Sequence, residues 1–87
     1  MNKTHNIKIR EGFADAVLSG EKTFEVREND RGYQKGDFIT FTVIDNLNII
    51  ISHPLDEETY LITYVLSGWG IEENKVVFSI KNTKELF

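Results

Sequence analysis

The chain has 87 residues, which is enough for one domain and too few for two. Its hydrophobic content of 40% supports one compact core, and the absence of cysteine excludes disulfides and thiolate metal sites. The net charge of −4 argues against broad, non-specific binding to nucleic acid. No basic start followed by an apolar run is seen, so we expect no signal peptide, and the longest apolar run, residues 49–51, is too short to cross a bilayer. We therefore expect a cytoplasmic protein with no membrane partner.

The charge is unevenly distributed along the chain. Residues 1–35 contain seven Lys or Arg against six Asp or Glu, a net charge of +1. Residues 36–87 contain three against eight, a net charge of −5. A small, locally basic site can exist on such an acidic body, whereas a long basic groove cannot.

The first third of the chain predicts a strand, a helix and a second strand. Alternating residues over 5–10 are typical of a half-buried strand. Residues 11–19 predict a short helix that ends at Gly20, a residue suited to the left-handed conformation after a last helical turn. Residues 22–28 predict the second strand. The apolar stripe of the helix comprises Phe13, Ala14, Val17 and Leu18. The faces of the second strand carry Phe24 and Val26 on one side, and Thr23, Glu25 and Arg27 on the other.

The rest of the chain predicts further strands. They are expected at 38–44, 59–66 and 75–81, and residues 49–52 are a candidate edge strand that Pro54 stops. Five or six short strands with one early helix indicate a mixed α/β, mainly β fold. We expect a single domain over 1–87, a small, mostly antiparallel β-barrel whose helix covers one open end.

The segment over 18–31 concentrates charge, with four acids and three bases in fourteen residues. If the first two strands are neighbours, their polar faces form one cleft. That cleft would hold Lys8, Lys22, Glu25 and Arg27. The alternative is an ordinary exposed strand face with surface salt bridges, which contribute little to stability.

Each residue type in this cleft has a chemical use. Arg27 can grip a phosphate or a pair of carbonyl oxygens with its planar guanidinium. Glu25 can accept a hydrogen bond from an exocyclic amine or hold Arg27 in place. Lys22 can act as a point charge or as a base. The loop that follows adds Asn29, Arg31 and Tyr33 to the expected ligand-binding residues.

Two aromatic residues and two histidines leave alternatives open. Tyr33 can stack on a base or pack over the barrel mouth. Trp69, between two glycines, can be a stacking platform, but capping of the core from its loop is the favoured interpretation. His5 is interpreted as a strand-end residue, and with His53 alone it does not make a metal site. We therefore expect no metal and no other cofactor.

A family resemblance adds to these expectations. The octapeptide Gly20-Glu21-Lys22-Thr23-Phe24-Glu25-Val26-Arg27 matches the G-x-K-x-x-E-x-R signature of the ASCH domains, which are relatives of the PUA RNA-binding domain. A longer set of matches resembles the small bacterial and phage family called domain of unknown function 3850. It comprises His5, Lys8-Ile9, Ala16-Val17-Leu18-Ser19-Gly20, Lys22-Thr23-Phe24-Glu25-Val26-Arg27, Asn29-Asp30-Arg31, Gly36-Asp37, Thr63-Tyr64-Val65-Leu66 and Val76-Val77-Phe78-Ser79-Ile80. The resemblance covers most of the chain apart from about residues 45–57, and it implies a PUA-like β-barrel.

The resemblance also implies candidate functions. Some ASCH relatives bind RNA, and others are small amidohydrolases that remove acyl groups from modified cytidine with a Lys, a Thr and a later Glu. Lys22 and Thr23 match the motif of those enzymes, but Glu25 occupies the position of the Thr that carries the nucleophile. Glu58 is a candidate for the later acid.

We expect a monomeric binding module for RNA or a nucleotide-like ligand. The first alternative is a small amidohydrolase that acts on acylated modified nucleosides, with Lys22, Thr23 and Glu25 as its catalytic residues. The second alternative is a phage or bacterial factor that acts by binding a protein partner.

Overall fold

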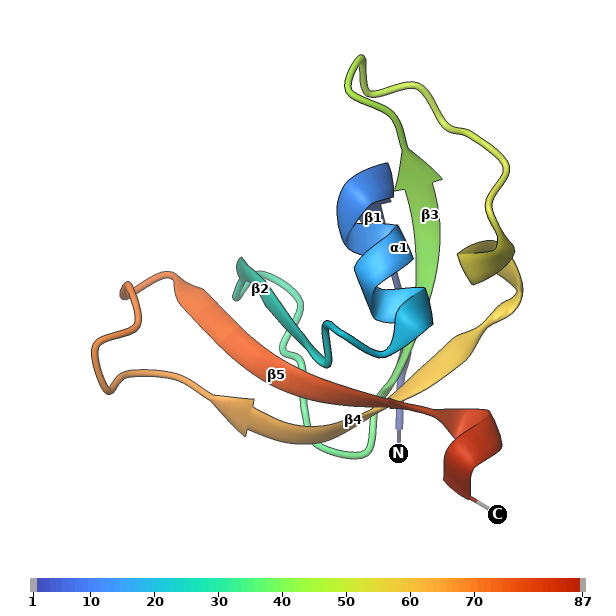
Figure 1. Ribbon diagram of the computed structural model, residues 1–87. Helices are drawn as coiled ribbons and strands as arrows, with labels where there is room; N and C mark the ends of the chain where they lie inside the picture. Colours follow the sequence, from blue (N-terminus) through green and yellow to red (C-terminus); the bar gives the residue numbers. More distant parts are fainter. Residues whose placement is uncertain (1, 87) are drawn as a thin grey trace.

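A computed structural model describes residues 2–86 of the chain, and these residues form a mainly β fold with one α-helix (Figure 1). The expected fold class, with its single early helix, is confirmed. The strands are β1 (Thr4–Arg10), β2 (Phe24–Glu28), β3 (Phe38–Ile44), β4 (Thr59–Leu66) and β5 (Lys75–Asn82). The helices are α1 (Glu11–Ser19) and two short 3-10 helices, η1 (Pro54–Glu57) and η2 (Thr83–Leu86).

The strands form one sheet in the order β1-β3-β4-β5-β2, which bends into a curled half-barrel (Figure 1). Three of the pairings are antiparallel, and β1 and β3 are parallel. The premise that the first two strands are neighbours is therefore wrong, because β1 and β2 are the two edges of the sheet. Register explains why β1 prefers β3. Ile7 lies beside Phe41 and Ile9 beside Val43, so the apolar sides of both strands face the same core.

Helix α1 covers the concave side of β1 and β3 (Figure 1). Ala14 and Val17 of its apolar stripe are buried, but Phe13 and Leu18 lie at the edges of the stripe and are exposed. The helix ends as expected at Gly20, whose φ of 86° is left-handed and whose N–H donates to the carbonyl of Val17 at 3.1 Å. This turn aims the chain toward β2.

The alternation predicted for residues 5–10 is confirmed, and β3, β4 and β5 also alternate between buried and less buried residues over most of their length. Their inward residues form the core together with α1, Leu55 of η1 and the ring of Tyr33. The inward residues include Ile7, Ile9, Ile39, Phe41, Val43, Ile62, Val76, Phe78 and Ile80. The candidate strand at 49–52 is reduced to a single bridge between Ile44 and Ile50.

Trp69 does not cap the core. Its side chain is 92% exposed at the tip of the β4–β5 connection, so the favoured interpretation is wrong. The reason is the backbone. Gly68, Trp69 and Gly70 all have positive φ values, and this tight left-handed turn carries the indole away from the sheet.

Candidate functional site

Strand β2 turns the side chain of Glu25 inward. Glu25 is 3% exposed, while Phe24 and Val26 on either side are 45% and 53% exposed. Pairing with β5 sets this orientation, because Glu25 lies opposite the fully buried Phe78 and Phe24 lies opposite Ser79 on the outer face. The apolar pair of β2 is therefore on the surface of the sheet.

The buried carboxylate of Glu25 lies between two cations. Lys22 Nζ donates to one carboxylate oxygen, and Arg27 Nη1 is 3.7 Å from the other. The ammonium of Lys22 also donates to the Phe24 carbonyl at 2.7 Å and lies near the rings of Phe13 and Phe24, 5.6 and 5.1 Å from their centroids. The negative charge of Glu25 is compensated, so its burial is sustainable.

Two arginines connect the edges of the sheet. Arg27 Nη1 donates to the carbonyl oxygen of Lys8 at 2.9 Å, and Arg31 Nη1 donates to that of Asn6 at 2.6 Å. Within residues 2–86, β1 pairs with β3 alone, so alternate carbonyls of β1 point away from β3 and would otherwise lack a protein partner there. The side chains of Arg27 and Arg31 thus bind the free edge of β1. No backbone hydrogen bonds of a strand pairing join β1 to β2 in residues 2–86.

A cleft of about 480 Å³ lies between these two edges, and we call it the edge cleft. It brings together the four residues expected to share a cleft. Its lining comprises Lys8, Ile9, Arg10, Phe13, Lys22, Phe24, Glu25, Val26, Arg27 and Ile44. With four cations and one acid, the lining has a net charge of +3 on a chain of net charge −4. It combines positive charge with exposed aromatic surface.

The three expected ligand residues of the loop are placed differently. Arg31 and Tyr33 border a neighbouring hollow of about 280 Å³ that shares Val26 and Arg27 with the edge cleft. Tyr33 is only 5% exposed, and its ring lies 4.8 Å from those of His5 and Phe78, so it has little surface left for stacking on a base. Asn29 lies outside both, and its N–H donates to the Asn74 carbonyl at 2.8 Å.

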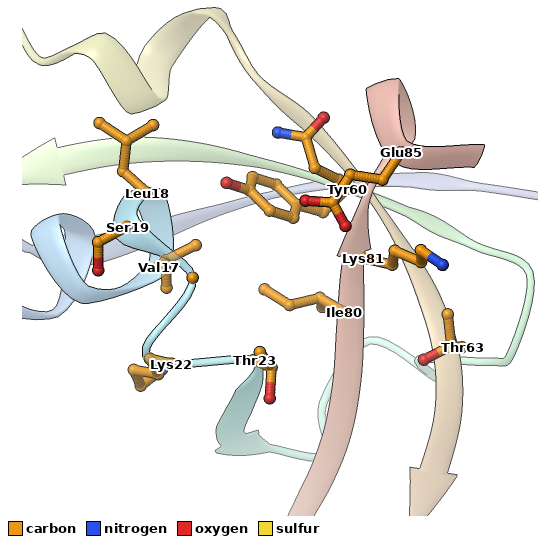
Figure 2. Close-up of a pocket in the computed structure, with 12 residues that line it drawn as sticks. Val17, Leu18, Ser19, Lys22, Thr23, Tyr60, Thr63, Ile80, Lys81 and Glu85 are labelled. Carbon is orange, nitrogen blue, oxygen red and sulfur yellow. The ribbon is translucent and has the colours of Figure 1, made fainter. Parts of the chain in front are cut away.

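The other suggested catalytic residue, Thr23, lines a hollow of about 370 Å³ between the end of α1 and β4–β5 (Figure 2). Lys22 borders this hollow as well as the edge cleft, but Glu25 does not. The ring of Tyr60 projects toward the helix here (Figure 2). Burial raises the pKa of the Tyr60 hydroxyl above its ordinary value, although a hydrogen bond with Asn82 partly offsets the effect. Glu58 is not in its lining and instead forms an ion pair with Lys84.

Both histidines have structural partners outside the edge cleft. His5 is buried, and its Nε2 lies 2.9 Å from Asp37 Oδ2. Burial pushes the pKa of Asp37 up, but hydrogen bonds from His5 and from the backbone N–H groups of Lys3 and Gln34 outweigh it, so the pKa is lowered overall. His53 caps η1 and bonds to Asp15 at 2.7 Å. Within residues 2–86, no three potential metal ligands gather at one point.

The apolar part of the edge cleft was not predicted from the sequence. Phe13, Phe24 and Val26 were assigned to helical and strand faces with no role in a site. The available signal was Glu25 itself. Once its carboxylate turns inward to meet Lys22, the alternation of the strand places both apolar neighbours outside.

The fold and the cleft together define a small, curled, mainly β domain with a basic, aromatic cleft at its open edge. The family model described as "Domain of unknown function (DUF3850)" matches residues 4–80, and the chain belongs to this family. The chain is also similar to the "Uncharacterized 12.9 kDa protein in GpA 3'region" of Escherichia phage P2, with 43% identity over 37 residues. That match covers 42% of this chain and only 34% of the phage protein. In the part of the chain described here, no helix is long and apolar enough to cross a membrane.

Proposed function

We propose that the edge cleft binds RNA or a nucleotide-like ligand in the cytoplasm. The observation that carries this proposal is the lining of the cleft, which combines four cations, two exposed aromatic rings and one buried carboxylate. A nucleotide presents the matching groups, which are an anionic phosphate, a flat base and polar base edges.

The parts of the cleft suggest separate roles. Lys8 and Arg10 are exposed at the rim and are suited to phosphate, since neither forms an ion pair with another described residue. The exposed ring of Phe13 offers a stacking surface. Glu25, held by Lys22, can accept a hydrogen bond from a base amine. The resemblance to ASCH domains, some of which bind RNA, is consistent with this assignment.

The net negative charge of the chain limits how many phosphates it can contact. We expect only one to three phosphate contacts, so affinity should fall gently with salt, with a slope far below that of proteins with long basic grooves. A monomer is sufficient, because one chain supplies every residue of the cleft.

Lys8 allows a clean test, since its side chain is exposed and its structural contact with Arg27 uses only its backbone carbonyl. Nucleoside monophosphates and short oligoribonucleotides would be titrated into the wild type, Lys8→Ala and the matched control Lys35→Ala. Lys35 lies in an exposed loop outside the edge cleft. We expect Lys8→Ala to weaken binding several-fold with no change in melting temperature, and Lys35→Ala to bind normally. An equal response from both variants would contradict the proposal.

The hydrolytic alternative places different demands on the site. It needs Lys22 and a hydroxyl at one reacting atom, and Thr23 lines the hollow of Figure 2, which Lys22 also borders but Glu25 does not. Release of free cytidine from acylated cytidine, lost in Lys22→Ala, would favour it. The protein-binding alternative would be favoured by a partner that binds the acidic half of the chain and not the edge cleft.

A further inference from the structure

A second exposed feature lies on the outer face of the sheet, across β2, β5 and β4. Strand register places Phe24 opposite Ser79 and Ser79 opposite Tyr64, so these side chains form one cross-strand row. The rings at its ends are 45% and 62% exposed. They are separated by two strand spacings, about 10 Å, which is too far for them to stack on each other.

The middle of the row is polar. A β-bulge between Ile62 and Tyr64 brings Thr63 into it, and Thr63 Oγ1 lies 2.7 Å from Ser79 Oγ. One hydroxyl donates to the other, which leaves one O–H and several lone pairs available to an outside group. A flat ring beside a hydroxyl pair offers stacking to a base face and hydrogen bonds to a base edge or a ribose 2′-hydroxyl.

The row is continuous with the edge cleft. Phe24 and Val26 line the cleft and also belong to the outer face, where Val26 lies opposite Val77. Lys81 is exposed, and alternation along β5 puts it on the same face as Ser79. It forms no ion pair with another residue in the range 2–86. A nucleic-acid strand that leaves the cleft over Phe24 would therefore meet the hydroxyl pair of Thr63 and Ser79, the ring of Tyr64 and the ammonium of Lys81.

We propose that this row is a second base-binding site, so that the ligand of the edge cleft is a short single-stranded RNA and not a free nucleotide. The inference rests on the proposed function, because the edge cleft holds the first nucleotide. The next base would stack on Tyr64. An apolar protein segment fits the row less well, since it would leave the hydroxyl pair without outside partners.

The test compares ligands of increasing length. Adenosine monophosphate and the adenylate di-, tri- and tetranucleotides would be titrated into the wild type, Tyr64→Phe, Tyr64→Ala and Leu47→Ala. Leu47 is 77% exposed in a distant turn and serves as the control. We expect affinity to rise from mononucleotide to trinucleotide. Tyr64→Ala should lower the affinity for the trinucleotide by roughly five- to tenfold and leave that for the mononucleotide unchanged. Tyr64→Phe and Leu47→Ala should bind the trinucleotide as the wild type does.

The outcomes separate the two proposals. Mononucleotide binding that does not strengthen with length, or a length effect that survives in Tyr64→Ala, would overturn the second site and leave the edge cleft. Oligonucleotide binding that needs Tyr64 but not Lys8 would overturn the edge cleft as the nucleotide site. Self-association abolished by Tyr64→Ala would identify the row as a contact between copies of the chain and would also overturn the inference.

Discussion

The guanidinium of Arg27 lies 2.9 Å from the backbone carbonyl of Lys8 and so connects the two edges of the sheet. No strand pairing joins β1 to β2 in residues 2–86, and the sheet order leaves both with one free side. Closure by a side chain differs from closure by a backbone ladder, because one substitution can remove it and one anionic ligand can compete for it.

Replacement of Arg27 by Ala should therefore weaken the fold. The variant leaves the Lys8 carbonyl unpaired and removes one of the two cations beside Glu25, and we expect unfolding free energy to fall by about 1–2 kcal/mol. Urea denaturation would measure it. Arg31→Ala removes the equivalent bond to Asn6 at a more exposed position and should lose less. Equal losses in the two variants would contradict this account.

Glu25→Gln should be strongly destabilising. The neutral amide keeps the shape of the side chain but leaves Lys22 and Arg27 next to each other without a compensating charge. We expect a loss of about 3 kcal/mol in denaturation experiments, near the lower end for broken buried ion pairs. Glu28→Gln is the matched control, because Glu28 is an exposed partner of Lys75, and it should lose less than about 1 kcal/mol. Similar stabilities of both variants would refute the role of Glu25.

Asp37 should make the protein sensitive to acid. Its pKa is lowered in the folded state from an ordinary value of 3.8, so its contribution is fully present above that pH. Stability is lost as the pH falls through the lower folded pKa, because the carboxylate must be protonated there. Urea midpoints measured at decreasing pH should show a steep loss below about pH 4 that is shallower in Asp37→Asn. If the urea midpoints of the two proteins fell equally steeply below about pH 4, Asp37 would not be the cause.

Tyr60 should ionise late in an alkaline titration. Burial raises its pKa above 10.0, so the neutral phenol stabilises the fold below that pH, and the stability is lost as the pH rises through the higher folded value. The ultraviolet absorbance of phenolate should include a delayed component that is missing in Tyr60→Phe. The persistence of that component in the variant would assign it to another tyrosine.

Trp69→Ala should leave stability almost unchanged, within about 0.5 kcal/mol, because the side chain is 92% exposed. Since this is the sole tryptophan, the wild-type fluorescence should be red-shifted and readily quenched by iodide. A blue-shifted, protected indole would mean that Trp69 packs on the protein after all.

The elements of the fold were largely predictable from local pattern. The helix over 11–19 and the strands at 38–44 and 59–66 have the expected bounds, because periodicity and the stop at Gly20 are local signals. Strand order was not predictable in this way. The pairing of Ile7 with Phe41 depends on which distant strand offers a matching apolar face, and no feature of residues 5–10 specifies it.

The candidate site was predictable in its charges but not in its construction. The four residues Lys8, Lys22, Glu25 and Arg27 do meet in the edge cleft, although the premise behind that prediction was wrong. They meet because the curled sheet brings its two edges together. The outward position of Phe24 was not predicted, since alternation alone does not say which face of a strand is buried, and the pairing of Glu25 with Lys22 that decides it was not recognised.

The parallel pairing of β1 with β3 also has a consequence for the order in which we expect the molecule to fold. Thr4 has its partner at Phe38, 34 positions further along, whereas β4 and β5 meet across a short connection. The hairpin of β4 and β5 can therefore form early, while the first strand must wait until the whole crossover has closed. The arginine bridges to the edge of β1 need β1 in place, so we expect the edge cleft to be completed after the hairpin of β4 and β5.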